Sequence, residues 1–213
     1  MLTKFSFIMA HFSRLLYRRT TLEDNATLFK AMCLLMNSFR SLKELRISFN
    51  TIQKDFLFDI SLPLQNMDKL EILNIEFLVH FNTVTENIFS QFANSLKNLK
   101  SLKELTLHIR HFDESKQINY TDNNSLEILG ESLGYLTNLE KLDLWLFFMD
   151  YRIGAVLYPL TWLANFQSLA LTIPLTNKNF PYLSEIYKEL NKFRRLKSLT
   201  LKFDRTSILE TDE

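Results

Sequence analysis

The chain has 213 residues, 46% of them hydrophobic, which is enough apolar material for one continuous core. Its net charge of +1 provides no global field that would attract nucleic acid or an anionic membrane. No apolar run approaches the ~20 residues that a membrane-spanning helix needs, and the short apolar start is not typical of a signal peptide.

One phrase, Leu-x-x-Leu-x-Leu, recurs along the chain and is its strongest pattern. Successive copies from residue 42 onward begin 28, 32, 37, 27 and 30 residues apart, and such a period indicates a stacked-repeat protein. Five copies are complete, and the first and sixth are degenerate. The copies begin at Leu2, Leu42, Leu70, Leu102, Leu139, Phe166 and Leu196. We therefore expect residues 1–213 to form a single domain of about six to seven repeats.

Each copy of the phrase predicts a short strand of about five residues. In the copy at 42–49, apolar residues at 45, 47 and 49 alternate with polar residues at 44, 46 and 48. This period of two is the pattern of a strand with one buried face. The same alternation follows the copies at 70, 102 and 196.

Between the strands the apolar period becomes helical. Helices are expected within 25–39, 85–99, 124–136 and 180–193, the first with a stripe of Leu28, Met32, Leu35 and Met36. In the segments 50–64 and 147–163, Pro63 and Pro159 predict short or broken helices. The single cysteine, Cys33, lies in the first helix, where we expect a small buried hydrophobe. A lone cysteine allows no internal disulfide and fits a reducing compartment.

Repeated alternation of strand and helix requires parallel strands with crossover connections. Strands lie ~4.8 Å apart, whereas helices are ~10 Å across, so the strands should line the inside of a curve and the helices its outside. The predicted fold class is therefore an α/β solenoid, an arc or horseshoe with a parallel concave sheet and convex helices.

The repeated phrase resembles that of the leucine-rich repeat family, in its ribonuclease-inhibitor-like form with a helix in each repeat. The chain is also similar in composition to divergent repeat proteins of protists such as ciliates. The family places Asn or Cys three residues after the last Leu, and here only Asn50 fits. The other copies carry Ala10, Leu78, Arg110, Phe147, Pro174 and Asp204. In the family, the Asn side chains at this position form a ladder of hydrogen bonds to the turns. Here we expect the apolar residue before each position to pack inward and to take over that role. The resemblance implies protein recognition by the concave sheet.

The sequence contains no motif whose residue types and spacing are typical of a catalytic site. The four histidines have no metal-ligand spacing, and the strand prediction puts His108 on the open face and His111 beyond the strand end. We therefore predict no enzyme activity, no metal site and no cofactor. Gly130, Gly134 and Gly154 are expected at helix contacts or loop turns. The basic clusters at 97–103 and 194–197 suit helix C-termini, and phosphate binding is the alternative.

The polar strand positions predict a partner-binding surface. Aligning the repeats puts Glu76, His108 and Trp145 side by side, with Arg46 and Asp143 flanking them. A tryptophan on a polar sheet face is a candidate hot-spot anchor, and the alternative is that an adjacent long loop covers Trp145. The polar insertion at 110–123 is either a specialised binding loop or a tolerated surface loop.

These patterns favour a non-enzymatic interaction or scaffold module in the cytoplasm that binds a protein and neither nucleic acid nor membrane. The alternative is a regulatory leucine-rich repeat segment of a larger enzyme such as a protein kinase. The strands near 2–7 and 199–203 each have one neighbour, so their apolar residues should be half-exposed. This favours a component of a larger assembly.

Overall fold

The computed structural model describes residues 3–8, 22–52, 56–79, 86–111, 124–146, 152–174 and 183–204. Within these ranges, seven strands alternate with six helices. The strands are β1 (Lys4–Ile8), β2 (Glu44–Ile52), β3 (Ile72–Val79), β4 (Glu104–His111), β5 (Lys141–Leu146), β6 (Ser168–Pro174) and β7 (Ser198–Asp204). The helices are α1 (Leu22–Met36), α2 (Phe56–Leu64), α3 (Glu86–Leu96), α4 (Ser125–Gly134), α5 (Ile153–Leu160) and α6 (Leu183–Leu190).

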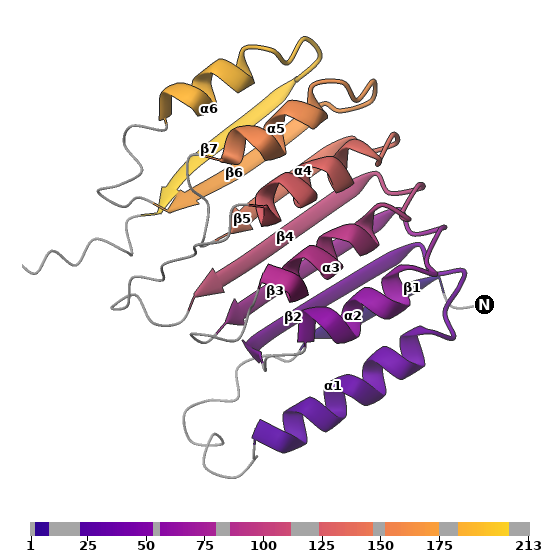
Figure 1. The fold of residues 1–213 in the computed structure, drawn as a ribbon. Coiled ribbons are helices and arrows are strands. Elements are labelled where there is room, and N and C mark those ends of the chain that lie inside the picture. The colour runs from indigo at the N-terminus through magenta and orange to yellow at the C-terminus, as the bar shows by residue number, and fades with distance from the viewer. Residues whose placement is uncertain are drawn as a thin grey trace, which may run out of the picture.

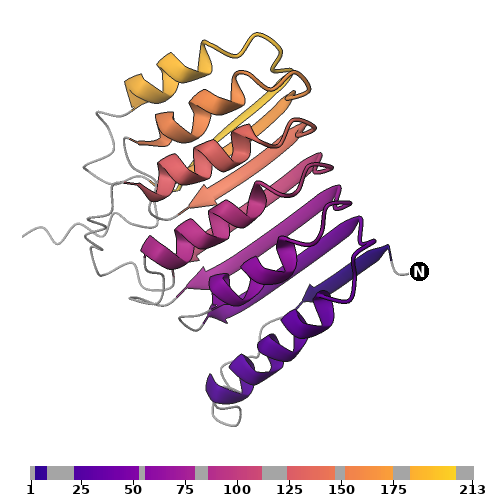
Figure 2. The same cartoon turned by 45° about the vertical axis from the view of Figure 1, so that its right-hand side comes forward.

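The strands form one sheet in which spatial order follows chain order from β1 to β7. Every neighbouring pair is parallel, and the fourth residue of each phrase lies in one row that includes Leu73, Leu105 and Leu142. The helices all cover the same face of the sheet (Figures 1 and 2). The predicted alternation and parallel sheet are confirmed, and the sequential order is consistent with a solenoid-like stack.

The core lies between the sheet and the helices. The inward strand residues Leu105, Leu107 and Ile109 are buried, as the period of two predicts, and the same holds for their row neighbours in β3. Strand β1 has the expected five residues, whereas the other strands are longer, up to nine residues in β2, because hydrogen bonding continues past the short alternating phrase. The described residues contain no helix long and apolar enough to cross a membrane.

The helices end earlier than predicted because tight turns follow them, two in succession after each of α1 to α5. In the third repeat, the N–H of Leu99 donates to the carbonyl of Leu96, and that of Leu102 donates to the carbonyl of Leu99, both at 3.0 Å. Bonds to the third preceding residue put an apolar side chain into the core at every third position. The phrase therefore extends backward by two more apolar positions, into the last turn of the helix.

The short helices expected around the two prolines are present as α2 and α5. Each ends one residue after its proline, Pro63 or Pro159, since proline cannot continue the helical hydrogen-bond pattern. The stripe predicted for α1 is partly wrong. Phe29 and Cys33 are buried there, whereas Leu28 and Leu35 are exposed, because α1 is the end helix and has a neighbouring helix only in α2.

A backbone ladder at the amino ends of the strands holds the repeats in register. The carbonyl of Lys43 accepts hydrogen bonds from the N–H groups of Glu71 and Ile72 at 2.8 and 2.9 Å, and the carbonyl of Glu71 accepts two from the next repeat. The expected inward packing before the missing asparagine positions is also present, since Phe77, Ile109 and Ile173 are buried.

Side chains add a second ladder, which we did not predict, at the same edge. The Asn138 amide donates to the carbonyl of Lys100 at 2.8 Å, and the Asn165 amide donates to that of Thr137 at 3.4 Å. The Arg195 guanidinium continues the series to the carbonyl of Ala164 at 2.9 Å. All three donor residues directly precede the first apolar residue of their phrase. The polar ladder therefore joins neighbouring loops at the amino ends of the strands, whereas the asparagine position of the family follows the carboxyl ends.

Glu71 bridges three repeats at this edge, and its titration should report that bridge. Its carboxylate accepts hydrogen bonds from Lys103 and Lys43, each at 2.8 Å, and these cations lower its pKa to about 2. Since the folded pKa lies below the unfolded value near 4.3, the bridge stabilises the fold above that pH. Its contribution is lost as pH falls from about 4.3 through about 2. An NMR titration of the Glu71 carboxyl carbon should give this pKa.

The matched variants for Glu71 are Lys103→Met and Lys69→Met. The first removes the cation that lowers the pKa most and should raise the pKa of Glu71 toward its ordinary range. The second removes a nearby exposed lysine that makes no contact with Glu71 and should leave the titration unchanged. Equal titration curves in the two variants would contradict the bridge.

Candidate functional site

The face of the sheet opposite the helices carries the outward-pointing strand residues, and we call it the open face. Strand pairing confirms the predicted rows. Glu76 pairs with His108, and His108 pairs with Trp145, so these three residues lie side by side on β3, β4 and β5. The rings of His108 and Trp145 meet edge to face with centroids 6.0 Å apart.

The five predicted residues are only partly brought together. Asp143 joins the central group, because its Oδ1 lies 3.0 Å from Nε2 of His108. Arg46 does not, since β2 and β5 are three strand spacings apart, or about 14 Å. Its guanidinium instead donates to Glu44 at 2.7 Å.

Arg110 belongs to the central group and was absent from our predicted site. Its guanidinium carbon lies 4.9 Å from the centroid of the Trp145 ring, within cation–π range. The sequence pattern places Arg110 at the start of the polar insertion 110–123, whereas β4 continues to His111. The alternation of Leu105, Leu107 and Ile109 with polar residues could have indicated that Arg110 also points outward.

The charges on the open face divide into paired and unpaired groups. Glu44 pairs with Lys4 at 2.8 Å, and Glu104 pairs with Lys141 at 2.6 Å. Hydrogen bonds from Lys4 and then from Arg46 lower the pKa of Glu44. In contrast, within the part of the chain that the structure describes, neither Glu76 nor Arg110 has an ion-pair partner. Nε of Arg110 is buried and makes no hydrogen bond there.

We name Glu76, His108, Arg110, Asp143 and Trp145 the central cluster. It combines one large aromatic surface, a histidine that an aspartate orients, and two opposite charges that have no ion-pair partner among the described residues. The insertion at 112–123 and the segment at 147–151 lie outside the described residues, so the choice between an exposed and a loop-covered Trp145 stays a prediction. Trp145 is partly buried within its row.

The prediction that His111 lies beyond the strand is wrong, because it is the last residue of β4 and pairs with Val79. Strand pairing extends further than the apolar alternation indicated. His11 and His80 lie outside the described residues. Among the residues that are described, no group of three His, Cys, Asp or Glu side chains is placed to hold a metal ion.

The glycine and cysteine predictions agree with the structure. Gly130 and Gly134 lie where α4 contacts α5, and an added Cβ at Gly130 would lie 2.1 Å from the carbonyl oxygen of Ala155. Cys33 is buried, and burial raises the pKa of its thiol to about 12. A thiol with so high a pKa is a packing group rather than a nucleophile.

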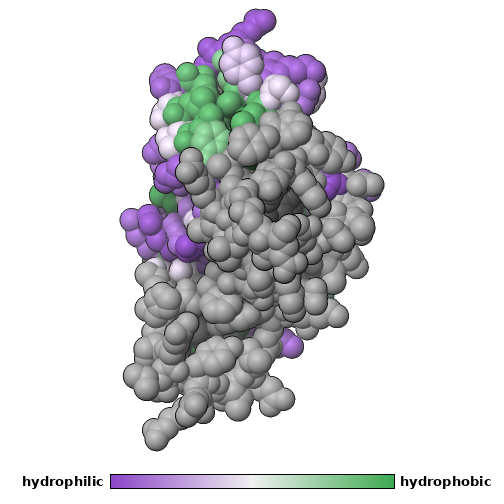
Figure 3. All heavy atoms as spheres, turned by 90° about the vertical axis from the view of Figure 1, so that its left-hand side faces the viewer, coloured by the Kyte–Doolittle hydropathy of each residue, from purple (hydrophilic) through white to green (hydrophobic). Residues whose placement is uncertain are grey.

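The end of the stack formed by α6 and β7 exposes apolar side chains, as predicted. Leu199, Leu201 and Phe203 are 45%, 37% and 46% exposed, whereas their row neighbours in β6 are buried. Figure 3 shows the apolar area at this end of the molecule. At the other end Phe5 is partly buried against the core, and the side chain of Phe7 lies outside the described residues.

Comparison with known proteins assigns the chain to no family, since no protein-family model matches it and no curated protein shows significant similarity to it.

Proposed function

We propose that the chain is a leucine-rich repeat solenoid that recognises a protein partner through the central cluster on its concave, open face. The observation that carries the proposal is Trp145. It stands on a polar sheet face and contacts both the imidazole of His108 and the guanidinium of Arg110 on the neighbouring strand β4. Tryptophan and arginine are enriched among the residues that dominate binding energy at protein interfaces.

The charges around Trp145 support recognition of a partner surface with both signs. Glu76 and Arg110 flank the aromatic group and have no ion-pair partners among the described residues, so a partner can supply the opposite charges. Such pairs mainly set specificity and association rate, while burial of the indole provides affinity. Arg46, about 14 Å from Asp143, would contact the edge of the same partner. The inert, buried Cys33 fits the cytoplasmic location that we propose.

Replacement of Trp145 by alanine tests the proposal. If the indole is an anchor, partner binding should weaken by about 30-fold, equivalent to ~2 kcal/mol, because a buried aromatic contact is lost. The partner can first be captured by placing a photo-crosslinking amino acid at residue 145. The same probe at Tyr187, an exposed residue on the helical side, is the control. Affinity is then measured by calorimetry.

The matched control is Tyr187→Ala, which removes an exposed aromatic side chain from the helical side of the molecule. It should leave partner affinity unchanged. If Trp145→Ala folds normally and binds as tightly as Tyr187→Ala, the central cluster is not the binding surface.

A further inference from the structure

The small net charge of the chain conceals a strongly basic edge. The six helix-to-strand loops all lie at the amino ends of the parallel strands, and we call them the loop edge. They comprise residues 37–43, 65–71, 97–103, 135–140, 161–167 and 191–197. Together they contain ten lysine and arginine residues and three acidic residues, a difference of +7, whereas the whole chain has +1.

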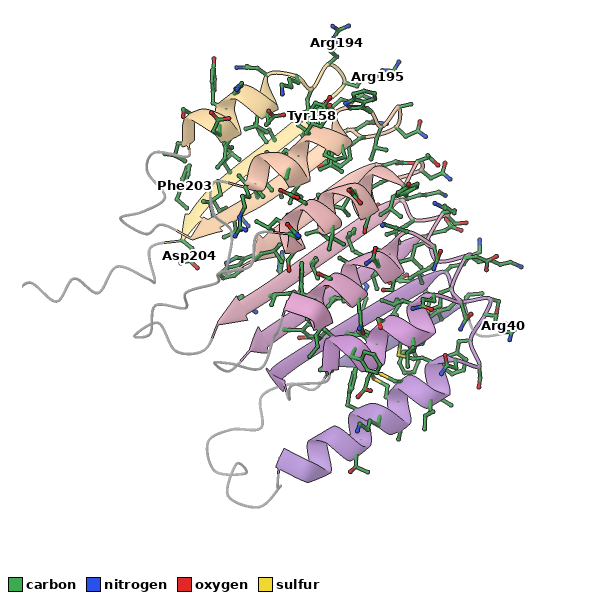
Figure 4. The ribbon with its side chains drawn as sticks, viewed as in Figure 1. Arg40, Tyr158, Arg194, Arg195, Phe203 and Asp204 are labelled. Atoms are coloured by element: carbon green, nitrogen blue, oxygen red, sulfur yellow. The ribbon has the colours of Figure 1, made fainter. Side chains whose placement is uncertain are left out.

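Much of this positive charge is not neutralised locally. Arg40 and Arg194 have no ion-pair partner within the described residues, and Lys197 donates to the neutral amide of Gln167. Lys43 and Lys103 share the single carboxylate of Glu71. Of the remaining cations, Lys192 pairs with Glu189 at 2.5 Å and Lys97 lies 3.9 Å from Glu131. Figure 4 shows Arg40, Arg194 and Arg195 along this same edge.

Exposed aromatic rings lie among these cations. Trp162 is 73% exposed and Tyr135 is 55% exposed, and both lie in successive loops of the edge. The ring of Tyr158, at the end of α5, meets Trp162 edge to face with centroids 5.8 Å apart. Lys100 lies over the Tyr135 ring at 4.9 Å, and Lys192 lies over the Tyr158 ring at 5.0 Å.

The two aromatic groups belong to one surface. The C-terminal ends of α4 and α5 are in contact, since a Cβ added at Gly134 would lie 3.0 Å from Cβ of Pro159. Tyr135 and Tyr158 directly adjoin these two residues in the chain. Cations of the loops 97–103 and 191–197 therefore flank aromatic residues at the ends of two neighbouring helices, which we name the aromatic strip: Tyr135, Tyr158 and Trp162.

We propose that the loop edge binds single-stranded nucleic acid, with phosphates along the basic loops and bases stacked on the aromatic strip. A basic track combined with exposed rings is the arrangement that binds single strands without sequence preference. This site is separate from the central cluster and does not depend on the function proposed for it. It also replaces our expectation from net charge, because binding follows local rather than total charge.

An anionic membrane would also attract these cations, but the loop edge offers it little aliphatic surface. The leucines of these loops, including Leu99, Leu136 and Leu163, are buried in the core, except Leu196, which is partly buried against it. Insertion into the acyl region needs an exposed apolar face. Trp162 and Tyr135 instead expose more than half of their surface to solvent, which suits stacking with bases.

The test uses the full chain with Trp145→Phe, so that Trp162 is the sole tryptophan, and a fluorescein-labelled 12-nucleotide oligouridylate. Anisotropy should show binding that weakens steeply between 50 and 200 mM salt, at about −0.7 in logarithmic slope per phosphate contact. Excess unlabelled RNA should quench Trp162 emission. Trp162→Ala should weaken binding at least fivefold, as expected for one lost stacking contact of ~1 kcal/mol or more.

Charge variants complete the design. Lys100→Gln combined with Arg194→Gln should weaken RNA binding and reduce the salt slope, whereas Lys30→Gln, at an exposed position of α1 away from the edge, should change neither. Vesicles of phosphatidylcholine with phosphatidylserine provide the competing surface. Binding to vesicles without RNA binding, or RNA binding that Trp162→Ala leaves unchanged, would overturn the proposal.

Discussion

Gly130→Ala is expected to lower the free energy of unfolding by about 3 kcal/mol, because overpacking against a backbone cannot be relieved by a side-chain rotation. The new Cβ would lie 2.1 Å from the carbonyl oxygen of Ala155 and 3.0 Å from Cα of Val156. Helices α4 and α5 would have to separate, and the buried Leu129 and Val156 would lose packing contacts. For a chain of this size, the corresponding fall in Tm is roughly 6–12 °C.

Gly154→Ala is the matched control for Gly130→Ala. It makes the same change in a neighbouring helix, but its Cβ would lie 3.5 Å from Cγ of Glu189, an ordinary contact. Since alanine favours helix over glycine by up to ~1 kcal/mol, this variant should be neutral or slightly more stable. Calorimetry gives the two Tm values, and hydrogen exchange should show the loss in Gly130→Ala beginning at α4 and α5. Equal Tm values would contradict the close approach of these helices.

Leu107→Ala and Leu201→Ala should differ severalfold in cost although both remove the same side chain from the same row of the sheet. Leu107 is fully buried in the middle of the stack, so its loss leaves a cavity and should cost about 3–5 kcal/mol. Leu201 is 37% exposed at the end of the stack, and its loss should cost about 1 kcal/mol.

Chemical denaturation monitored by circular dichroism gives the free energy of unfolding of both variants. Because the two leucines hold the same position in their repeats, the variants differ only in their place along the stack. Because end repeats of a stack unfold more readily than central ones, hydrogen exchange should also show that Leu201→Ala affects β7 and α6 first. A loss for Leu201→Ala as large as that for Leu107→Ala would mean that the end face is covered in solution.

The periodicity of the chain was sufficient to predict most of the fold. Apolar residues at 105, 107 and 109, and their equivalents in other copies, predicted the buried strand faces, and alignment of the repeated phrase predicted the correct row neighbours. A slip of one residue would move the apolar side chains to the other face of the sheet. The same alignment placed Glu76 beside His108 and His108 beside Trp145. Helix ends were predicted less well, because the tight turns after Leu96 and Leu133 keep the apolar spacing without continuing the helix.

The central cluster and the loop edge were harder to predict for different reasons. Arg110 was missed because strand length depends on pairing with β3, not on the residues of β4 alone. The sequence predicts only separate basic clusters at 97–103 and 194–197, because the lysines and arginines of the basic edge are spread over four loops that are far apart in the sequence. Only the parallel arrangement of the strands brings those loops to one edge.

The sequence by itself determined the repeat period, the inward and outward faces of the strands and the parallel order of the sheet, because these follow from local periodicity and chain connectivity. Only the tertiary structure decided which charges are paired, which rings are exposed and where helices touch. Those properties depend on contacts across repeats, such as Glu71 with Lys43 and Lys103, Arg110 over Trp145, and Gly130 against Ala155. Contacts of this kind depend on distances that periodicity does not set.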